Sequence, residues 1–190
     1  QVFNMPLDMV TPIMRSRAKA VNFGIVYGIG AFSLAKDIGV SNKEAKHYIE
    51  SYLAHYSGVD SYMKNVVEKA NADGYVETMF GRRRNLPELT SSKHMIRAFG
   101  ERVARNMPIQ GTAADIIKIA MIKVDERMKA ENLRARLVLQ VHDELIVEAP
   151  QDESMRVALI VQEEMENAVK MSVPLTADAA IGRTWYDAKG

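Results

Sequence analysis

Four side chains near the start of the chain combine positive charge with aromatic rings at a regular spacing. Arg15, Lys19, Phe23 and Tyr27 lie four residues apart, and Gly28 follows them. At 3.6 residues per turn, a step of four residues advances the direction by about 40°, so a helix carries all four on one broad face. Cations bind phosphates, and flat rings stack on bases. The spacing therefore predicts a helix face that binds a nucleoside triphosphate.

Two adjacent acids, Asp143 and Glu144, lie where two apolar runs meet. Both runs have the composition of buried strands. A carboxylate beside such strands needs a partner, and a divalent cation is one way to supply it. Because the chain has no cysteine, oxygen ligands favour Mg²⁺ or Mn²⁺. A polar β-turn is the alternative interpretation, because Asp is common in turns.

His142 precedes the two acids and suggests a second kind of site, a metal-dependent hydrolase built on the pair His142-Asp143. The other histidines are His47, His55 and His94, and they share no motif spacing with it. A histidine-rich metal site is therefore not expected. The simpler interpretation makes His142 a hydrogen-bonding group beside the acid.

The stretch between Arg82 and Arg105 holds most of the basic excess and contains side chains suited to DNA. Arg102 and Asn106 lie four apart on one expected helix, and Gln110 follows Pro108. Such side chains reach base edges and sugar oxygens, and the minor groove offers mainly acceptors. A polar, exposed helix face is the alternative. The three adjacent residues Arg82, Arg83 and Arg84 are suited to phosphate contacts. The alternative is that they are simply solvated.

Composition and charge narrow the class of protein. The absence of cysteine excludes disulfides and thiolate metal sites. No apolar run has the length of a membrane span, and the N-terminus does not resemble a signal peptide. We therefore expect a cytoplasmic protein with no membrane partner. Residues 1–110 carry more basic than acidic side chains, and residues 111–190 carry more acidic than basic ones. This division fits a protein that binds a polyanion in one place and a metal cation in another. An uneven distribution of solvated surface charge is the alternative interpretation.

The order of the expected elements, helices first and then strands with helices, predicts an α+β fold in two lobes. Pro108 is expected to interrupt a helix, and 81–87 to form a basic loop. Apolar periodicity, capping residues and breakers predict helices at 13–27, 31–39, 42–56, 59–72, 92–106, 112–130 and 152–170, strands at 75–80 and 173–181, and a hairpin of 136–141 with 144–149.

These motifs together resemble family A DNA polymerases of the bacterial polymerase I type. The series Arg15-x₃-Lys19-x₃-Phe23-x₃-Tyr27-Gly28 is similar to the motif of the fingers, and 140–144 (Gln-Val-His-Asp-Glu) is similar to the second motif of the palm. The segments 74–84 and 106–115 look like family segments between the two. The resemblance runs from Val2 nearly to the C-terminus, with its motifs in the family's order and spacing.

The resemblance implies a helical fingers subdomain at 1–92, whose nucleotide-binding helix is 13–28. It implies the C-terminal part of an antiparallel-sheet palm with flanking helices at 93–190. The implied activity is template-directed DNA synthesis, in which dNTPs are added to a primer 3′-hydroxyl by two-metal phosphoryl transfer. Primer–template DNA and a dNTP are the implied partners. Mg²⁺, for which Mn²⁺ can substitute, is the implied cofactor.

The resemblance also assigns roles to single residues of the nucleotide-binding helix. Arg15 and Lys19 would contact the triphosphate, with Lys19 near the leaving group as well. Phe23 would lie against the sugar and base, and Tyr27 would pack at the position of the templating base.

The palm motif and the segments around it receive roles in the same way. Asp143 would be a metal ligand of the catalytic site, with Glu144 beside it in a supporting role. The minor groove near the primer end would be lined by His142, Arg102, Asn106 and Gln110.

One departure from the family is that the first palm motif, which carries the other metal carboxylate, is not present in this sequence. The sequence, which does not begin with Met, is therefore expected to be a piece of a longer polymerase. We expect the piece to be inactive alone, to need the missing N-terminal part as a partner, and to self-associate through an exposed sheet edge. A non-catalytic nucleic-acid-binding module is the alternative function.

Overall fold

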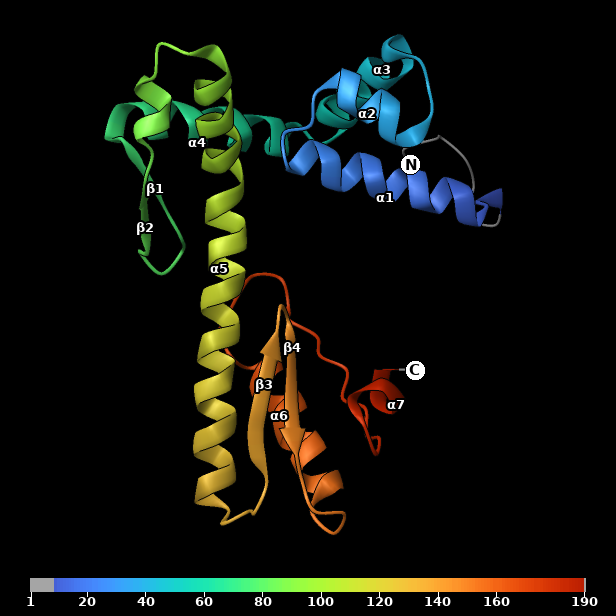
Figure 1. The fold of residues 1–190 in the computed structure, drawn as a ribbon, viewed down its shortest axis with the longest axis vertical. Coiled ribbons are helices and arrows are strands. Elements are labelled where there is room, and N and C mark those ends of the chain that lie inside the picture. The colour runs from blue at the N-terminus through green and yellow to red at the C-terminus, as the bar shows by residue number, and fades with distance from the viewer. Residues whose placement is uncertain (1–8, 190) are drawn as a thin grey trace. The chain divides into compact units, whose positions relative to one another are not determined.

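The computed structural model describes residues 9–189. The first eight residues, which belong to the expected fingers subdomain, and Gly190 lie outside the described residues. The chain forms two compact units, one ending at Ile109 and the other beginning at Gln110. Helices dominate and the strands form two small antiparallel sheets (Figure 1), so the predicted α+β class is confirmed. The expected subdomain boundary between residues 92 and 93 stays a prediction.

Four helices begin the first unit: α1 (Pro12–Val26), α2 (Ala31–Ile38), α3 (Asn42–His55) and α4 (Ser57–Asp73). All four were predicted, because their ends carry local signals. The Thr11 hydroxyl caps α1 by accepting from the Met14 amide at 3.3 Å. Ser41 and Glu44 form the predicted capping box at the start of α3.

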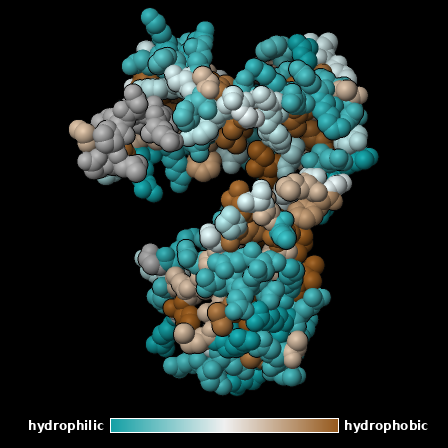
Figure 2. All heavy atoms as spheres, turned by 180° about the vertical axis from the view of Figure 1, so that it is seen from behind, coloured by the Kyte–Doolittle hydropathy of each residue, from teal (hydrophilic) through white to brown (hydrophobic). Residues whose placement is uncertain are grey.

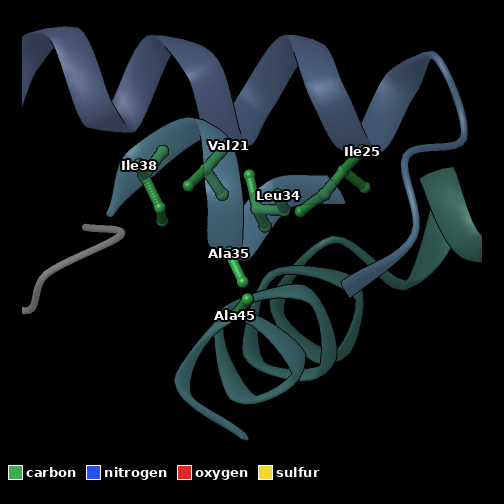
Figure 3. Close-up of a cluster of buried hydrophobic side chains, with 6 residues drawn as sticks. All are labelled: Val21, Ile25, Leu34, Ala35, Ile38 and Ala45. Atoms are coloured by element: carbon green, nitrogen blue, oxygen red, sulfur yellow. The ribbon is translucent and has the colours of Figure 1, made fainter. Parts of the chain in front are cut away.

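One face of α1 is buried against α2 and α3. Figure 3 shows side chains from the three helices pointing toward one another, and this cluster consists of Val21, Ile25, Leu34, Ala35, Ile38 and Ala45. The opposite face of α1 is consequently left to the solvent, and it is the face that carries the four spaced side chains of interest.

A short hairpin follows α4, formed by β1 (Tyr75–Glu77) and β2 (Arg83–Asn85). The predicted strand at 75–80 was too long, because a turn begins after Glu77. The predicted basic loop at 81–87 was wrong in part, since Arg83 pairs with Glu77 across the hairpin. A 3₁₀ helix, η2 (Pro87–Thr90), comes next. A second core lies beneath this region, and it consists of Ala70, Val76, Leu86, Leu89 and Ala104.

The helix α5 (His94–Ala130) is continuous and contains Pro108 in its interior. We had predicted an interruption at Pro108 and a new helix start at Thr112, and both predictions were wrong. Proline removes one backbone donor, but buried side chains on both sides of it hold the helix in place. Ala104 is fully buried before Pro108, and Val124 is fully buried after it.

The second unit contains the predicted hairpin, formed by β3 (Arg136–Val141) and β4 (Glu144–Glu148), with the helices α6 (Ser154–Glu166) and α7 (Trp185–Lys189). The core of this unit joins α5, the hairpin and α6, and it consists of Val124, Met128, Ala135, Val157 and Ile160. The strands are less buried than expected: Val138 and Leu139 are about half exposed.

The strand predicted at 173–181 is not formed. That segment is irregular, and it finds no pairing strand among residues 9–189. Pro174 lacks the amide that a ladder needs, and the Ala177 amide donates to the Glu166 carboxylate at 3.1 Å instead.

The face shown in Figure 2 carries many hydrophilic residues. Exposed large hydrophobic side chains occur in both units. Across residues 9–189, every helix is too short or too polar to cross a membrane.

Candidate functional site

The exposed face of α1 presents its cations and rings in the predicted order. Arg15, Lys19, Phe23 and Tyr27 are all exposed. The Lys19 ammonium lies 5.8 Å from the centre of the Phe23 ring. The Phe23 and Tyr27 rings are stacked, with centres 6.2 Å apart and planes at 23°. The sequence spacing therefore produces a continuous strip of charge followed by flat apolar surface.

The end of α1 is fixed by a Schellman motif. The Gly28 amide donates to the Ile25 carbonyl at 2.9 Å, and the Ile29 amide donates to the Gly24 carbonyl at 2.8 Å. Gly28 has φ +75°, a left-handed conformation that glycine adopts without strain. This geometry ends the helix directly after the second ring and holds Tyr27 at the tip.

The C-terminal end of α1 lies against α5. A side chain at Gly28 would meet the Arg105 guanidinium at 3.4 Å and the Arg102 side chain at 3.8 Å. The Arg105 guanidinium therefore lies next to the negative end of the α1 dipole, whereas Arg102 approaches it with the aliphatic part of its side chain. The structure brings Arg102, one of the predicted DNA contacts, beside the end of the predicted nucleotide-binding helix.

An apolar cavity of about 240 Å³ lies beside the same helix end, between α1, the start of α4 and α5. Its lining includes Val26, Met63 and Tyr62, and partial burial raises the pKa of the Tyr62 hydroxyl. Arg105 is the charged residue among its lining residues. An apolar space of this kind does not suit a triphosphate, so the prediction of nucleotide binding stays with the exposed strip and is not moved to this cavity.

The two predicted acids lie at a tight corner between β3 and β4, with His142 and Asp143 forming the two-residue turn. His142 has φ 52°, an uncommon left-handed conformation for a residue with a side chain. The Gln140 side-chain amide donates to the His142 carbonyl at 2.5 Å and closes the turn. The corner is therefore held in one conformation by a side chain of the adjoining strand.

The carboxylates of Asp143 and Glu144 differ in what they contact. Within residues 9–189, Asp143 is exposed and makes no hydrogen bond or ion pair. Both oxygens of Glu144 are engaged by α7: the Trp185 indole donates at 3.2 Å, and the Lys189 ammonium lies at 3.0 Å. Only Asp143 offers an unengaged carboxylate at the corner.

An unengaged carboxylate suits a hard divalent cation such as Mg²⁺. Across residues 9–189, however, no cluster of three or more His, Asp or Glu side chains is placed to hold a metal ion. The donor set at the corner thus fits one ligand of a metal site. The prediction of Asp143 as a metal ligand is compatible with this geometry and stays a prediction.

The three adjacent arginines lie on and beside β2, where all are exposed. Arg83 is held in place, because its guanidinium pairs with Glu77 at 3.2 Å and lies 4.4 Å from the Tyr75 ring centre. Arg84 occupies the next position on the strand. The hairpin can thus present positive charge to a phosphate backbone, although Arg83 already has an acidic partner.

The candidates on α5 are unequal in exposure. Arg102 and Gln110 are exposed, whereas Asn106 is half-buried. The Oδ1 atom of Asn106 is buried without a hydrogen-bond partner among the described residues. Because this oxygen is buried and can only accept, it does not itself support a contact with the acceptors of the minor groove, and the role of Asn106 stays a prediction.

Sequence reasoning missed three residues that shape the corner: Gln140, Trp185 and Lys189. Gln140 belongs to the quoted motif but received no role. Trp185, the chain's single tryptophan, and Lys189 four residues later are spaced for one helix face. Nothing in their local pattern connects them with Glu144, which lies 41 residues earlier than Trp185.

Comparisons with known proteins agree over the whole chain. A family model described as DNA polymerase family A matches residues 1–187. DNA polymerase I of Bacillus caldotenax is 54% identical over 188 residues, covering 99% of this chain and 21% of that protein. DNA polymerase I of Bacillus subtilis is 52% identical, with the same coverage of both chains. This chain spans about a fifth of the length of these curated relatives.

A solved structure is similar in fold as well as in sequence. It is described as the POL domain of Pol1 from M. smegmatis in complex with DNA primer–template and dNTP. The TM-score is 0.95 at 46% identity, and the match covers 100% of this chain and 33% of the other.

Proposed function

This chain belongs to DNA polymerase family A, and on that basis we propose that it works in template-directed DNA synthesis. The reaction adds deoxynucleotides from dNTPs to the 3′-hydroxyl of a primer. The observation that carries the proposal is the exposed strip on α1, where two cations and two stacked rings follow one another. Phosphoryl transfer depends mainly on positioning and charge neutralisation, and such a strip can supply both to a nucleotide.

The strip binds the incoming dNTP. Arg15 and Lys19 hold the triphosphate, and Lys19 adds charge near the leaving group. Phe23 lies against the sugar and base, and Tyr27 packs at the position of the templating base. The Lys19–Phe23 distance of 5.8 Å supports this assignment, because one nucleotide can touch both side chains.

Asp143 acts as a ligand of the catalytic metal, and Glu144 supports it from the adjoining position. Mg²⁺, or Mn²⁺ in its place, supplies positive charge at the reacting phosphate when bound. His142, Arg102, Asn106 and Gln110 contact the minor groove near the primer end. Arg82, Arg83 and Arg84 contact the phosphate backbone of the DNA. The exposure of most of these side chains supports the assignment.

This chain alone is expected to be inactive. The sequence holds one of the two palm motifs that carry metal-binding carboxylates, and residues 9–189 do not assemble a complete metal site. The partner implied is a polypeptide that supplies the first palm motif.

Primer extension with Mg²⁺ tests the proposal. The chain is assayed alone, then mixed with a separately made segment that carries the first palm motif, and then as Asp143→Ala in the same mixture. We expect extension only in the mixture, and its loss in Asp143→Ala. Templated incorporation by the chain alone would contradict the expected inactivity. Full activity of Asp143→Ala in the mixture would remove Asp143 from the metal site.

The alternative function is a non-catalytic nucleic-acid-binding module. The exposed arginines of β2 favour it. Binding of a primer–template that is unchanged by EDTA and by Asp143→Ala, together with no extension in a correctly assembled mixture, would support the module and not the polymerase.

A further inference from the structure

The carboxylate of Glu144 is held by the helix α7. Trp185 donates its indole N–H to Oε2 at 3.2 Å, and the Lys189 ammonium lies 3.0 Å from Oε1. One short helix thus engages both oxygens of an acid at the catalytic corner. Figure 1 shows α7, in dark red, beside β4 of the hairpin.

The conformation of α7 is fixed by contacts of its own. Thr184 and Asp187 cap it reciprocally: the Thr184 amide donates to the Asp187 carboxylate at 3.1 Å, and the Asp187 amide donates to the Thr184 hydroxyl at 3.2 Å. Gly182 allows the chain to fold back closely, because a side chain there would lie 2.5 Å from the Ala188 amide nitrogen. The conformation of α7 is therefore supported by contacts within its own segment, besides those to Glu144.

The two contacting side chains of α7 form a pair on one helix face. They are four residues apart, and the Lys189 ammonium lies 5.4 Å from the centre of the Trp185 ring. The ring limits the positions open to the lysine, and the lysine brings a full positive charge to Glu144. A hydrogen bond and an ion pair, one to each oxygen, together hold the direction of that carboxylate.

The two neighbouring acids differ in their contacts. Two adjacent carboxylates repel each other, and a cation paired with one of them reduces that repulsion. Glu144 has such a cation in Lys189, whereas Asp143 has no partner within residues 9–189. The contacts of α7 thus separate an anchored acid from an available one.

We propose that α7 is a positioning element of the catalytic corner, in which Trp185 and Lys189 anchor Glu144 so that Asp143 alone is presented to the metal ion. The inference rests on the proposed role of Asp143 as a metal ligand. Trp185 and Lys189 are positioning residues, because they act through Glu144. Partners that orient the groups around a metal typically change metal affinity or activity by about 10- to 100-fold when removed.

The first test uses the chain itself and needs no catalysis. Trp185 is the only tryptophan, so the fluorescence of the chain reports on α7 alone. Trp185 is already 44% exposed, so we expect Glu144→Ala to raise acrylamide quenching of Trp185 by up to about twofold and to shift its emission to the red, because the indole loses its acceptor. Tyr186→Ala is the matched control, since Tyr186 lies on α7 and is 88% exposed. Equal quenching in wild type and Glu144→Ala would overturn the proposal.

The second test uses a complete polymerase that contains this chain. Trp185→Phe keeps the ring and removes the donor, and Lys189→Met keeps the length and removes the charge. We expect each to lower kcat for primer extension about tenfold and to leave the KM for dNTP unchanged, because α1 binds the nucleotide. Lys189→Arg should restore most of kcat. Tyr186→Ala and Lys170→Met, two exposed positions, should match wild type.

The outcomes separate this inference from the proposed function. If Asp143→Ala abolishes extension while Trp185→Phe and Lys189→Met stay at wild-type kcat, the polymerase assignment stands and the role of α7 is refuted. A fall of kcat in Tyr186→Ala equal to that in Trp185→Phe would mean general damage to α7 and would also refute it. If Asp143→Ala retains activity, the proposed function fails first, and the inference fails with it.

Discussion

The residues of α1 show how a local spacing becomes one exposed face of a helix. A four-residue step keeps Arg15, Lys19, Phe23 and Tyr27 on one face wherever the helix forms. Burial of Val21 and Ile25 on the other side decides which face meets the solvent. Both features depend on neighbours within a few residues or on simple apolar patterning. The exposure and order of these side chains could therefore be predicted from the sequence, whereas nucleotide binding by them stays a prediction.

Lys19→Ala tests the centre of that strip in a complete polymerase containing this chain. Loss of a charged contact to a phosphate costs about 1.5–3 kcal/mol. We therefore expect kcat/KM for dNTP to fall about 10- to 100-fold. Arg17→Ala is the matched control, because Arg17 is an exposed cation on α1 that points about 200° away from Arg15. Steady-state primer extension measures both, and an equal effect of the two substitutions would remove Lys19 from the site.

The contacts of Glu144 could not be predicted in the same way. Its partners Trp185 and Lys189 lie on α7, far from Glu144 in the sequence. No local sequence pattern indicates that these residues are in contact. The positive φ of His142 could not be predicted either, because the surrounding hairpin, and not the residue type, enforces this backbone conformation. The sequence identified which residues form the corner but not what holds them.

Elements were predictable where their ends carry their own signals. The capping box of Ser41 and Glu44 specifies the start of α3 through bonds that span three residues. Pro108 misled the prediction, because buried neighbours outweigh the loss of one helical hydrogen bond. The strand predicted at 173–181 was wrong for a related reason. A strand needs a partner strand, and alternating apolar residues alone do not provide one.

Gly100 lets α5 pack closely on η2, and its substitution tests how these two elements fit together. A side chain there would lie 3.0 Å from the Glu88 Cβ and 3.2 Å from the Leu89 amide nitrogen, which is backbone and cannot move aside easily. Gly100→Ala should destabilise the first unit by about 1–3 kcal/mol, despite the better helix propensity of alanine. Urea unfolding followed by circular dichroism measures this effect.

Gly58→Ala is the matched control for that substitution. Gly58 lies in α4, and nothing stands within 4 Å of a side chain placed there. Alanine should be neutral or stabilising by up to about 1 kcal/mol. Equal stability of the two variants would show that the approach of α5 to η2 is not close enough to require glycine.

The ends of α5 and α6 are joined by an ion-pair network that predicts a pH dependence. Arg156 donates to both oxygens of Glu131, and Arg127 donates to it from α5. These bonds, those from Arg156 first, hold the pKa of the Glu131 carboxyl below its ordinary value of 4.5. A lowered folded-state pKa contributes stability that is present above pH 4.5 and is lost as the pH falls through the folded value.

Arg156→Met should therefore lower the urea midpoint of the second unit at pH 7, and the difference from wild type should shrink as the pH falls below 4.5 and through the lowered pKa of Glu131. Lys118→Met, at an exposed position of α5, should match wild type at both pH values. Trp185 fluorescence follows this unit, because the chain's one tryptophan lies within it. If the urea midpoint of Arg156→Met remained as far below that of wild type at pH 3 as at pH 7, Arg156 would stabilise the unit by packing and not by charge.

At the scale of the whole molecule, the chain is a family A polymerase segment spanning about a fifth of its relatives' length. Its hairpin of β3 and β4 is a sheet of two strands, so each strand has an edge that is unpaired among the described residues. Unpaired edges with exposed apolar residues attract other strands. Val138, at the irregular position of β3, is such a residue and is 51% exposed.

We therefore expect the isolated chain to self-associate as its concentration rises, and we expect Val138→Lys to weaken that association. Val173→Lys is the control, because Val173 is also exposed but lies in an irregular segment. Sedimentation velocity across a concentration series distinguishes the variants. A monomer at every concentration in the wild-type chain would refute the expectation.

The turn at His142 has a consequence for how sequences at this corner can change. Its φ of 52° costs a residue with a side chain about 1–2 kcal/mol, and glycine is the usual occupant of such a turn. His142→Gly should raise the stability of the hairpin by up to about 1 kcal/mol after the chain-entropy penalty of glycine, while removing the imidazole that we place near the primer end. In a library randomised at this one codon, we consequently expect glycine to be enriched under selection for heat resistance and histidine to be enriched under selection for DNA synthesis. The ratio of the two enrichments would measure how much stability the lineage has traded for activity at a single position.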